Sequence, residues 1–264
     1  MNELLPTDFV FHQSNLQAFQ NCRFSFLLRY VRKLPWPAPL SARTNDFEKD
    51  LAAGSTLHAL THQFFLGIDP ELLVSCAANN PDVRVSAWFA SFLASPYAKQ
   101  SPNQLTEHST QITLNDSLLL AKFDLITLEE DMIKICDWKT SRVLPKRQFL
   151  EERIQTKVYS LVASRMSQSV RLITMHYWEA AFPEHPVILE ISDTQLQRYE
   201  LEIADLISRI RSLPEAEFTR TEDPRRCSYC EYQSYCLRNG SPADEESFQD
   251  WFEIGLSEIQ GQEN

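Results

Sequence analysis

Two aspartates and a lysine stand close together in the sequence, in two consecutive apolar segments separated by an acidic turn at residues 129–131. Asp124 belongs to the first segment, and Asp137 and Lys139 belong to the second. Alternating and β-branched apolar residues around such a turn predict two antiparallel strands, and side chains two positions apart share a strand face. Asp137 and Lys139 are therefore expected on one face. Two carboxylates and an ammonium at one place suit a divalent metal ion and a positioned nucleophile, whereas an Asp-x-Lys pair alone more often forms a surface salt bridge.

Two further pairs of polar residues have the spacing of one helical turn. Gln155 and Tyr159 share a predicted helix face, where an amide and a phenol can hydrogen-bond a phosphate backbone or a water molecule. His58 and His62 form the second pair, but the zinc protease pattern requires Glu directly after the first His, and Ala59 stands there. A single helical histidine is more often structural than a ligand, and we interpret His62 in that way.

Cysteines provide the most specific spacing in the chain. Three of them stand in a short, tyrosine-rich segment as Cys227-x2-Cys230-x5-Cys236, and Cys22 is the candidate for a fourth ligand. Four thiolates fit either a 4Fe–4S cluster or a structural zinc ion. Such a site would close a loop of roughly 200 residues, and the stabilisation from closing a loop grows with its length. The other two cysteines, Cys76 and Cys136, have no partner spacing and are interpreted as buried small apolar residues.

Composition limits the class of protein. With 264 residues and 43% hydrophobic residues, the chain can bury a full core. Its 36 acidic and 25 basic residues give a net charge of −11, which argues against indiscriminate coating of nucleic acid and leaves room for a local basic groove. No apolar run of membrane-spanning length and no N-terminal signal are present, so we expect a protein of the reducing cytoplasm without membrane contact.

Hydrophobic periodicity predicts a mixed α/β fold. The expected helices run from Ser14 to about Val31 with Cys22 inside, from Asp46 or Gly54 onward, and over residues 70–79, 83–94, 149–166 and 192 or 193–212. The expected strands cover residues 105–114, 118–128, 131–138, 170–179 and 187–191. Asn115-Asp116 is a good hairpin dipeptide between the first two strands. An extended linker is expected at Pro35–Pro39, after the first helix.

Taken in order, Gly54-x3-His58, Asp124, Asp137-Trp-Lys139-Thr140 and Gln155-x3-Tyr159 resemble the RecB-like branch of the PD-(D/E)XK nuclease superfamily. The resemblance extends over roughly residues 11–238. It implies a restriction-endonuclease-like αβββαβ core with an N-terminal helical arm and a C-terminal cysteine-cluster region. It also implies a nuclease domain at residues 1–239, closed by the four cysteines. The uneven charge of the sequence predicts a separate acidic tail at residues 240–264.

The resemblance further implies roles for individual residues. The implied ligands of Mg²⁺ or Mn²⁺ are Asp124, Asp137 and His58. Lys139 would orient the attacking water and offset charge in the transition state, while Gln155 and Tyr159 would contact substrate near the scissile phosphate. Glu107 stands where such proteins often carry a glutamate and is given lower weight. Two positions depart from the family pattern, since Ala121 replaces a usual glycine and Arg23 a usual proline.

The cysteine layout resembles the iron–sulfur subset of these nucleases and the related CRISPR-associated exonucleases, which favours a 4Fe–4S cluster over zinc. The implied function is metal-dependent cleavage of single-stranded DNA or DNA ends in repair, recombination or CRISPR-type processing, with a helicase or an adaptation complex as possible partner. A non-catalytic iron–sulfur DNA-binding subunit and a thiolate redox protein are the alternatives. The presence of Asp124, Asp137 and Lys139 favours the enzyme.

The last 25 residues contain seven acidic residues and no lysine or arginine. Within residues 245–258 the acids alternate with aromatic and aliphatic residues, which gives an apolar stripe beside a negative face. A short helix packed on the core is the favoured interpretation. Alternatively, this tail covers a basic surface near Arg142, Arg147 and Arg225 and competes there with DNA.

Overall fold

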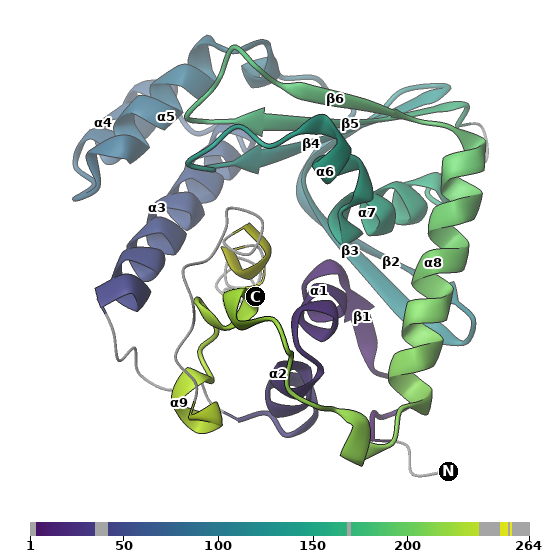
Figure 1. The fold of residues 1–264 in the computed structure, drawn as a ribbon. Helices are drawn as coiled ribbons and strands as arrows, with labels where there is room; N and C mark the ends of the chain where they lie inside the picture. The colour runs from purple at the N-terminus through teal and green to yellow at the C-terminus, as the bar shows by residue number, and fades with distance from the viewer. Residues whose placement is uncertain (1–3, 35–41, 168–169, 238–248, 253, 255–264) are drawn as a thin grey trace. The chain divides into compact units, whose positions relative to one another are not determined.

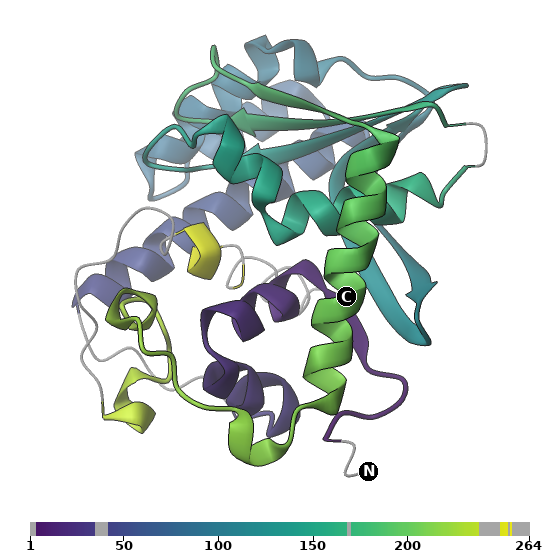
Figure 2. The ribbon, with the colours of Figure 1, turned by 45° about the vertical axis from the view of Figure 1, so that its right-hand side comes forward.

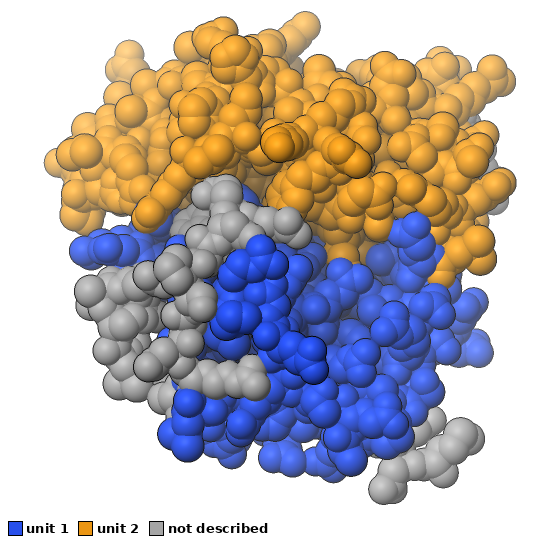
Figure 3. Space-filling model, in the orientation of Figure 1, with its two compact units in different colours: residues 1–51, 113–119, 202–264 blue, residues 52–112, 120–201 orange. Residues whose placement is uncertain are grey.

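The structure is a computed structural model that describes residues 4–34, 42–167, 170–237, 249–252 and 254. The chain forms two compact units, which Figure 3 colours separately. Unit 1 consists of residues 1–51, 113–119 and 202–264, and unit 2 of residues 52–112 and 120–201. Each unit has its own cluster of buried apolar side chains.

A mixed sheet forms the centre of unit 2 (Figure 1). Its strands are β2 (Gln104–Leu114), β3 (Ser117–Leu128), β4 (Met132–Lys139), β5 (Leu172–Glu179) and β6 (Val187–Ile191). The order is β3-β4-β5-β6, with β2 paired to β3. Strand β4 runs antiparallel to β3, with Leu125 opposite Cys136, and parallel to β5, with Asp137 opposite Tyr177. The mixed α/β fold expected from the sequence is thereby confirmed.

Helices cover both faces of this sheet (Figure 2). Trp138 and Trp178 pack among apolar residues of α3 (Ala42–Phe65), α4 (Pro70–Ala78) and α5 (Val83–Ala94). Their neighbours Asp137 and Tyr177 instead contact α7 (Ile154–Ser164), which follows the short α6 (Arg147–Glu152). Because adjacent strand residues point to opposite faces, α3–α5 and α7 lie on opposite sides of the sheet. The helix expected over residues 149–166 is thus two helices, interrupted by the extended backbone of Arg153.

The N-terminal helix of unit 1 differs from the prediction. Instead of one helix from Ser14 to Val31, the chain forms β1 (Val10–His12), α1 (Gln13–Asn21), α2 (Arg23–Phe26) and the π-helix η1 (Leu27–Val31). Cys22 lies between α1 and α2 in extended backbone, with φ −162° and ψ 110°. The amide of Phe24 donates to the carbonyl of Thr219 at 3.1 Å, so a tertiary contact takes a hydrogen bond that a continuous helix would use. The prediction that Cys22 sits inside a helix is wrong for this reason.

The C-terminal part of unit 1 contains α8 (Asp193–Ser212, which begins in unit 2) and short helical turns. These turns are η3 (Glu215–Glu217), η4 (Pro224–Cys227) and α9 (Gln233–Cys236). Trp251, Phe252 and Ile254 are buried and pack with Ala18, Phe47 and Leu51. These described residues of the acidic tail therefore belong to the core of unit 1. Residues 245–248, 253 and 255–258 and the expected boundary at 239–240 lie outside the described residues. The proposed competition with DNA stays a prediction.

Several local predictions can be compared with the structure directly. Asn115 and Asp116 have φ values of 46° and 60°, the left-handed backbone that a two-residue hairpin requires. Cys136 is buried as expected, but Cys76 is exposed. The buried face of α4 consists of Leu73 and Ala77, and Cys76 lies on the face turned to solvent. The linker at Pro35–Pro39 lies outside the described residues. Among the helices in the described ranges, none is long and apolar enough to cross a membrane.

Candidate functional site

The acidic residues of the candidate site sit on the paired strands β3 and β4 of unit 2. Asp124 lies one residue before the point where Leu125 pairs with Cys136, and Asp137 lies one residue after it. Antiparallel pairing therefore brings the two aspartates to neighbouring positions. Asp124, Asp137 and Lys139 are 6%, 2% and 3% exposed. Charged groups this deeply buried require close partners, because the loss of hydration is otherwise very costly.

Asp124 and His58 hold each other in place. His58, on α3, lies with Nδ1 3.1 Å from Oδ1 of Asp124 and Nε2 3.0 Å from the carbonyl oxygen of Trp138. The amide of Trp138 donates to the second carboxylate oxygen of Asp124 at 2.7 Å. Both nitrogens of the imidazole and both oxygens of the carboxylate are thus engaged, which fixes the orientation of the two side chains.

Glu107, on β2, completes a group of three potential metal ligands. Its Oε1 lies 4.0 Å from Nδ1 of His58, and its Oε2 lies 3.0 Å from Nζ of Lys122. One ligand atom each from His58, Glu107 and Asp124 lie within 4.8 Å of one another. Glu107 also has φ 48°, a conformation that residues other than glycine rarely adopt and that often marks a functional position. Carboxylate oxygens with one imidazole nitrogen form a donor set that fits Mg²⁺ or Mn²⁺.

The carboxylates of this group stabilise the protonated form of His58. Burial alone disfavours the charged imidazole, yet Asp124, Glu107 and Asp137 together raise the pKa of His58 to about 9. Burial opposes ionisation of Asp124, but the charges of His58 and Lys139 and its hydrogen bonds lower its pKa. The pKa of Glu107 is raised by burial and by the charge of Asp124. A bound cation would replace the proton of His58 as the positive partner of the carboxylates.

Asp137, expected as a metal ligand together with Asp124 and His58, lies in a separate set of contacts, and its role as a ligand stays a prediction. Nζ of Lys139 forms an ion pair with Oδ2 of Asp137, and Nε2 of Gln155 donates to Oδ1 at 2.9 Å. The ammonium of Lys139 also lies 5.7 Å from the ring centre of Tyr177. Asp137 and Lys139 share a strand face, as expected, and α7 brings Gln155 to them. Among the described residues, the close ligand group contains Glu107, while Asp137 is engaged by Lys139 and Gln155.

Tyr159 stands one turn after Gln155 on α7 and is buried. Its ring packs edge-on against that of Phe123, with ring centres 5.1 Å apart. Phe123 directly precedes Asp124 in the sequence. The structure therefore places Tyr159 near the aspartate strands, and its contact with substrate stays a prediction.

Glu179 is a buried residue of this region that sequence reasoning missed. It lies on β5 opposite Lys139 and is 1% exposed. Its carboxylate accepts hydrogen bonds from the amide of Ser141 at 3.2 Å and from the hydroxyl of Ser141 at 3.1 Å. These bonds hold the segment that follows Lys139. No local pattern signals the contact, because it depends on the parallel register of β4 and β5.

The four predicted cysteine ligands come together in unit 1. Cys22, Cys227, Cys230 and Cys236 line one small cavity. Cys22 stands at the break between α1 and α2, and Cys227 ends η4, whose first turn is capped by Asp223 through the amide of Arg225 at 3.0 Å. Burial and the charge of Glu231 raise the pKa of the Cys230 thiol, and Cys22 and Cys227 raise it further. Four sulfur donors around one cavity fit either a 4Fe–4S cluster or zinc.

Polar contacts tie the cysteine segment to the N-terminal helices. Nε of Arg29 donates to Glu231 at 2.8 Å, and the side chains of both residues are almost fully buried. The hydroxyl of Tyr232 donates to the carbonyl of Leu34 at 3.1 Å. Glu231 and Tyr232 directly follow Cys230, so these contacts hold the cysteine segment against η1 and the residues after it.

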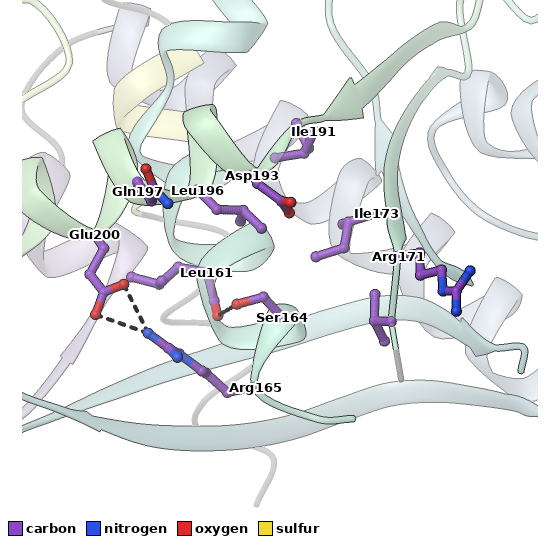
Figure 4. Close-up of a pocket in the computed structure, with 11 residues that line it drawn as sticks. Leu161, Ser164, Arg165, Arg171, Ile173, Ile191, Asp193, Leu196, Gln197 and Glu200 are labelled. Carbon is purple, nitrogen blue, oxygen red and sulfur yellow. Dashed lines mark hydrogen bonds and ion pairs between the residues drawn. The ribbon is translucent and has the colours of Figure 1, made fainter. Parts of the chain in front are cut away.

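A further hollow of about 420 Å³ lies in unit 2 between α7, β5, β6 and the start of α8 (Figure 4). Arg165 and Glu200 face each other across one side of it, with Nη2 2.9 and 2.8 Å from the two carboxylate oxygens. None of the predicted site residues is among its lining residues.

One comparison with known proteins identifies a family. The model of the PD-(D/E)XK nuclease superfamily matches residues 11–237. A search of curated proteins found no match. Among solved structures, one described as "Crystal structure of SSO0001" is similar, with 15% sequence identity, 90% of each chain covered and a TM-score of 0.41.

Proposed function

Because this chain belongs to the PD-(D/E)XK nuclease superfamily, we propose that unit 2 carries an active site for metal-dependent hydrolysis of phosphodiester bonds in DNA. The proposal rests on two groups of buried side chains that include the charged residues of β3 and β4. His58, Glu107 and Asp124 form a compact ligand group, and Asp137 and Lys139 form an ion pair close by. The family match covers all of these residues.

We propose that His58, Glu107 and Asp124 hold Mg²⁺ or Mn²⁺, with Asp137 as a further carboxylate ligand. When bound, such an ion polarises a phosphoryl oxygen and makes water a stronger nucleophile. His58 serves as a ligand only in its neutral form, so at neutral pH its ring has to release a proton first. The Trp138 carbonyl, which already faces Nε2, then keeps Nδ1 turned toward Asp124.

Lys139 is the residue to which we assign stabilisation of charge on the phosphoryl group. Its ammonium is held beside Asp137 and the Tyr177 ring with little exposure to water, and electrostatic effects are strong in such an environment. Gln155 fixes the carboxylate of Asp137, and Glu179 holds the segment after Lys139 through Ser141. Tyr159 is proposed to contact the substrate near the scissile phosphate.

For unit 1, we propose a 4Fe–4S cluster bound by Cys22, Cys227, Cys230 and Cys236, as in the iron–sulfur subset of RecB-like nucleases. The shared cavity of the four thiols supports a bound centre. Zinc is the alternative for the same donor set. In either case the centre would join the N-terminal helices to the C-terminal segment, a structural role that suits a reducing compartment such as the cytoplasm.

The proposed substrate is single-stranded DNA or a DNA end, which the protein would cleave as an exonuclease. The cleavage would serve repair, recombination or CRISPR-type processing, with a helicase or an adaptation complex as partner. This part of the proposal comes from the resemblance of the motifs and of the cysteine layout.

The test is cleavage of end-labelled single-stranded DNA by anaerobically purified protein, with Mg²⁺ or Mn²⁺ and with EDTA. We expect metal-dependent cleavage that is lost in Asp137→Asn and retained in Asp131→Asn, which removes an exposed carboxylate from the turn before β4. Equal cleavage by Asp137→Asn and the natural protein would overturn the assignment. Binding of DNA without cleavage by the natural protein would favour the non-catalytic iron–sulfur subunit.

A further inference from the structure

Four arginines line one hollow of about 670 Å³ in unit 1. They come from three segments, with Arg23 on α2, Arg209 on α8, and Arg220 and Arg226 before and within η4. The hydrogen bond from the Phe24 amide to the Thr219 carbonyl joins α2 to the segment that carries Arg220. In a chain with a net charge of −11, this concentration of guanidinium groups is a local reversal of charge.

Two of these arginines rest on aromatic rings. The guanidinium carbon of Arg23 lies 5.7 Å from the ring centre of Phe19, and that of Arg220 lies 5.4 Å from that of Phe24. In the described part of the chain, neither Arg23 nor Arg220 forms an ion pair. The rings orient the two guanidinium groups and leave their N–H donors for a ligand, since a stacked arginine keeps its donors in the plane of the group.

The remaining charges of the hollow leave it positive. Arg226 is paired with Asp250 at 2.9 Å, and Asp223 is paired with Arg225, whose Nε lies 3.0 Å away. Arg209 is 55% exposed and lies 3.9 Å from Asp205. Among the described acids that line the hollow, Glu222 is then the one whose negative charge opposes the positive charges of Arg23, Arg209 and Arg220.

Further polar residues of the hollow suit the backbone of a nucleic-acid strand. Thr219 and Thr221 also belong to the lining. Arginine and threonine are typical donors to phosphate oxygens, and positively charged grooves that follow the backbone are how proteins bind single strands.

We propose that this hollow, which we call the arginine groove, binds the phosphate backbone of single-stranded DNA through Arg23, Arg209 and Arg220. The proposal rests on the proposed function for the nature of the substrate, and it adds a binding surface on unit 1 that is distinct from the acidic residues of unit 2.

The test compares Arg23→Gln/Arg220→Gln with a control that removes two arginines from unit 2, Arg84→Gln/Arg171→Gln. Arg84 shares the stacked position, since its guanidinium also lies over a ring, 5.2 Å from Trp88, but it is ion-paired with Asp82. Binding of fluorescently labelled oligodeoxythymidine is measured by anisotropy in EDTA at several salt concentrations. We expect the Kd of the groove variant to rise at least about tenfold at low salt. The slope of log K against log salt should fall by about 1.4, because each single-strand phosphate contact contributes about 0.7.

Control measurements separate this proposal from the others. Iron content and thermal unfolding show whether Arg23→Gln disturbs the adjacent Cys22, and if it does, Arg209→Gln/Arg220→Gln provides the same test without a substitution on α2. Natural affinity and slope in the groove variants would overturn the proposal, as would a larger loss of duplex binding than of single-strand binding. Since no metal is present in the binding assay, failure of the natural protein to cleave DNA in Mg²⁺ or Mn²⁺ would overturn the proposed function and leave the groove standing.

Discussion

The acidic site of unit 2 and the cysteine site of unit 1 are built in opposite ways. Asp124, Asp137 and Lys139 lie on paired strands. Each has a partner within two residues or on the neighbouring strand, to which His58 and Gln155 add contacts from the helices. Cys22 lies at a break between helices, and Cys227 and Cys236 end short helical turns. A sheet positions side chains by its repeating backbone geometry. The positions of side chains on short turns depend instead on the contacts that these turns make with other segments.

Substitutions of ligand residues should therefore have different consequences in the two sites. The ligand group of unit 2 stays in place through backbone pairing, so loss of one carboxylate should affect chemistry more than folding. The cysteine segment is joined to η1 and Leu34 by Arg29–Glu231 and Tyr232, and to α1 by a hydrogen bond from Arg226 to Asn21. The proposed centre would add a further connection. Loss of a cysteine should therefore affect folding more than chemistry.

The largest effect is expected for Asp124→Asn. The change keeps the shape of the side chain but removes its negative charge from the group with His58 and Glu107, so the cleavage rate should fall about a thousandfold or more, at the upper end for a single electrostatic group. Cleavage of labelled DNA with Mn²⁺ and thermal unfolding are measured together, with Asp131→Asn as control. A large loss of stability with little loss of activity would reverse the comparison.

Cys22→Ser should have the next largest effect, on stability. Loss of the bound centre would release a loop of roughly 200 residues, and closure of a loop of this length is worth up to about 5 kcal/mol. We expect loss of bound iron or zinc and a lower free energy of unfolding, measured by metal analysis and urea denaturation. Cys76→Ser, at an exposed cysteine, is the matched control. Full metal content in Cys22→Ser would remove this residue from the site.

Glu107→Gln sharpens the ligand assignment within unit 2. If Glu107 belongs to the ligand group with His58 and Asp124, the affinity for Mn²⁺ should fall about 10- to 100-fold, as is typical when the ligand environment of a metal site is altered. Calorimetric titration of the protein with Mn²⁺ measures this change. Glu129→Gln, in the exposed turn before β4, should bind Mn²⁺ like the natural protein. Unchanged affinity in Glu107→Gln would restrict the ligand group to the aspartates and His58.

The smallest effect is expected for Trp251→Phe. The indole of Trp251 donates to the carbonyl of Arg226 at 2.9 Å, directly before Cys227, and its ring packs with Phe47 and Leu51. The substitution keeps most of the apolar contact and removes the hydrogen bond, which costs about 1 kcal/mol of unfolding free energy. Urea denaturation measures the loss. A gain in DNA binding instead of a loss of stability would favour the alternative role of the tail.

Local pattern accounts for most of what could be predicted. The strand alternation, the Asn115-Asp116 hairpin and the shared face of Asp137 and Lys139 all follow from neighbouring residues in the chain, and the structure agrees with each. The helix ranges agree less well where tertiary hydrogen bonds compete, as at Cys22, or where the backbone turns out of the helix, as at Arg153.

The sequence by itself determined which residue types are present and which of them share a strand or helix face, because periodicity is a local property. Only the tertiary structure decided which faces meet. It brings His58 of α3 to Asp124, sets Glu107 in its left-handed conformation beside them, and pairs Glu179 with Ser141 through the parallel register of β4 and β5. It also gathers Arg23, Arg209 and Arg220 around one hollow. These contacts join segments up to about 200 residues apart, and their free energy comes from packing and pairing that no local pattern records.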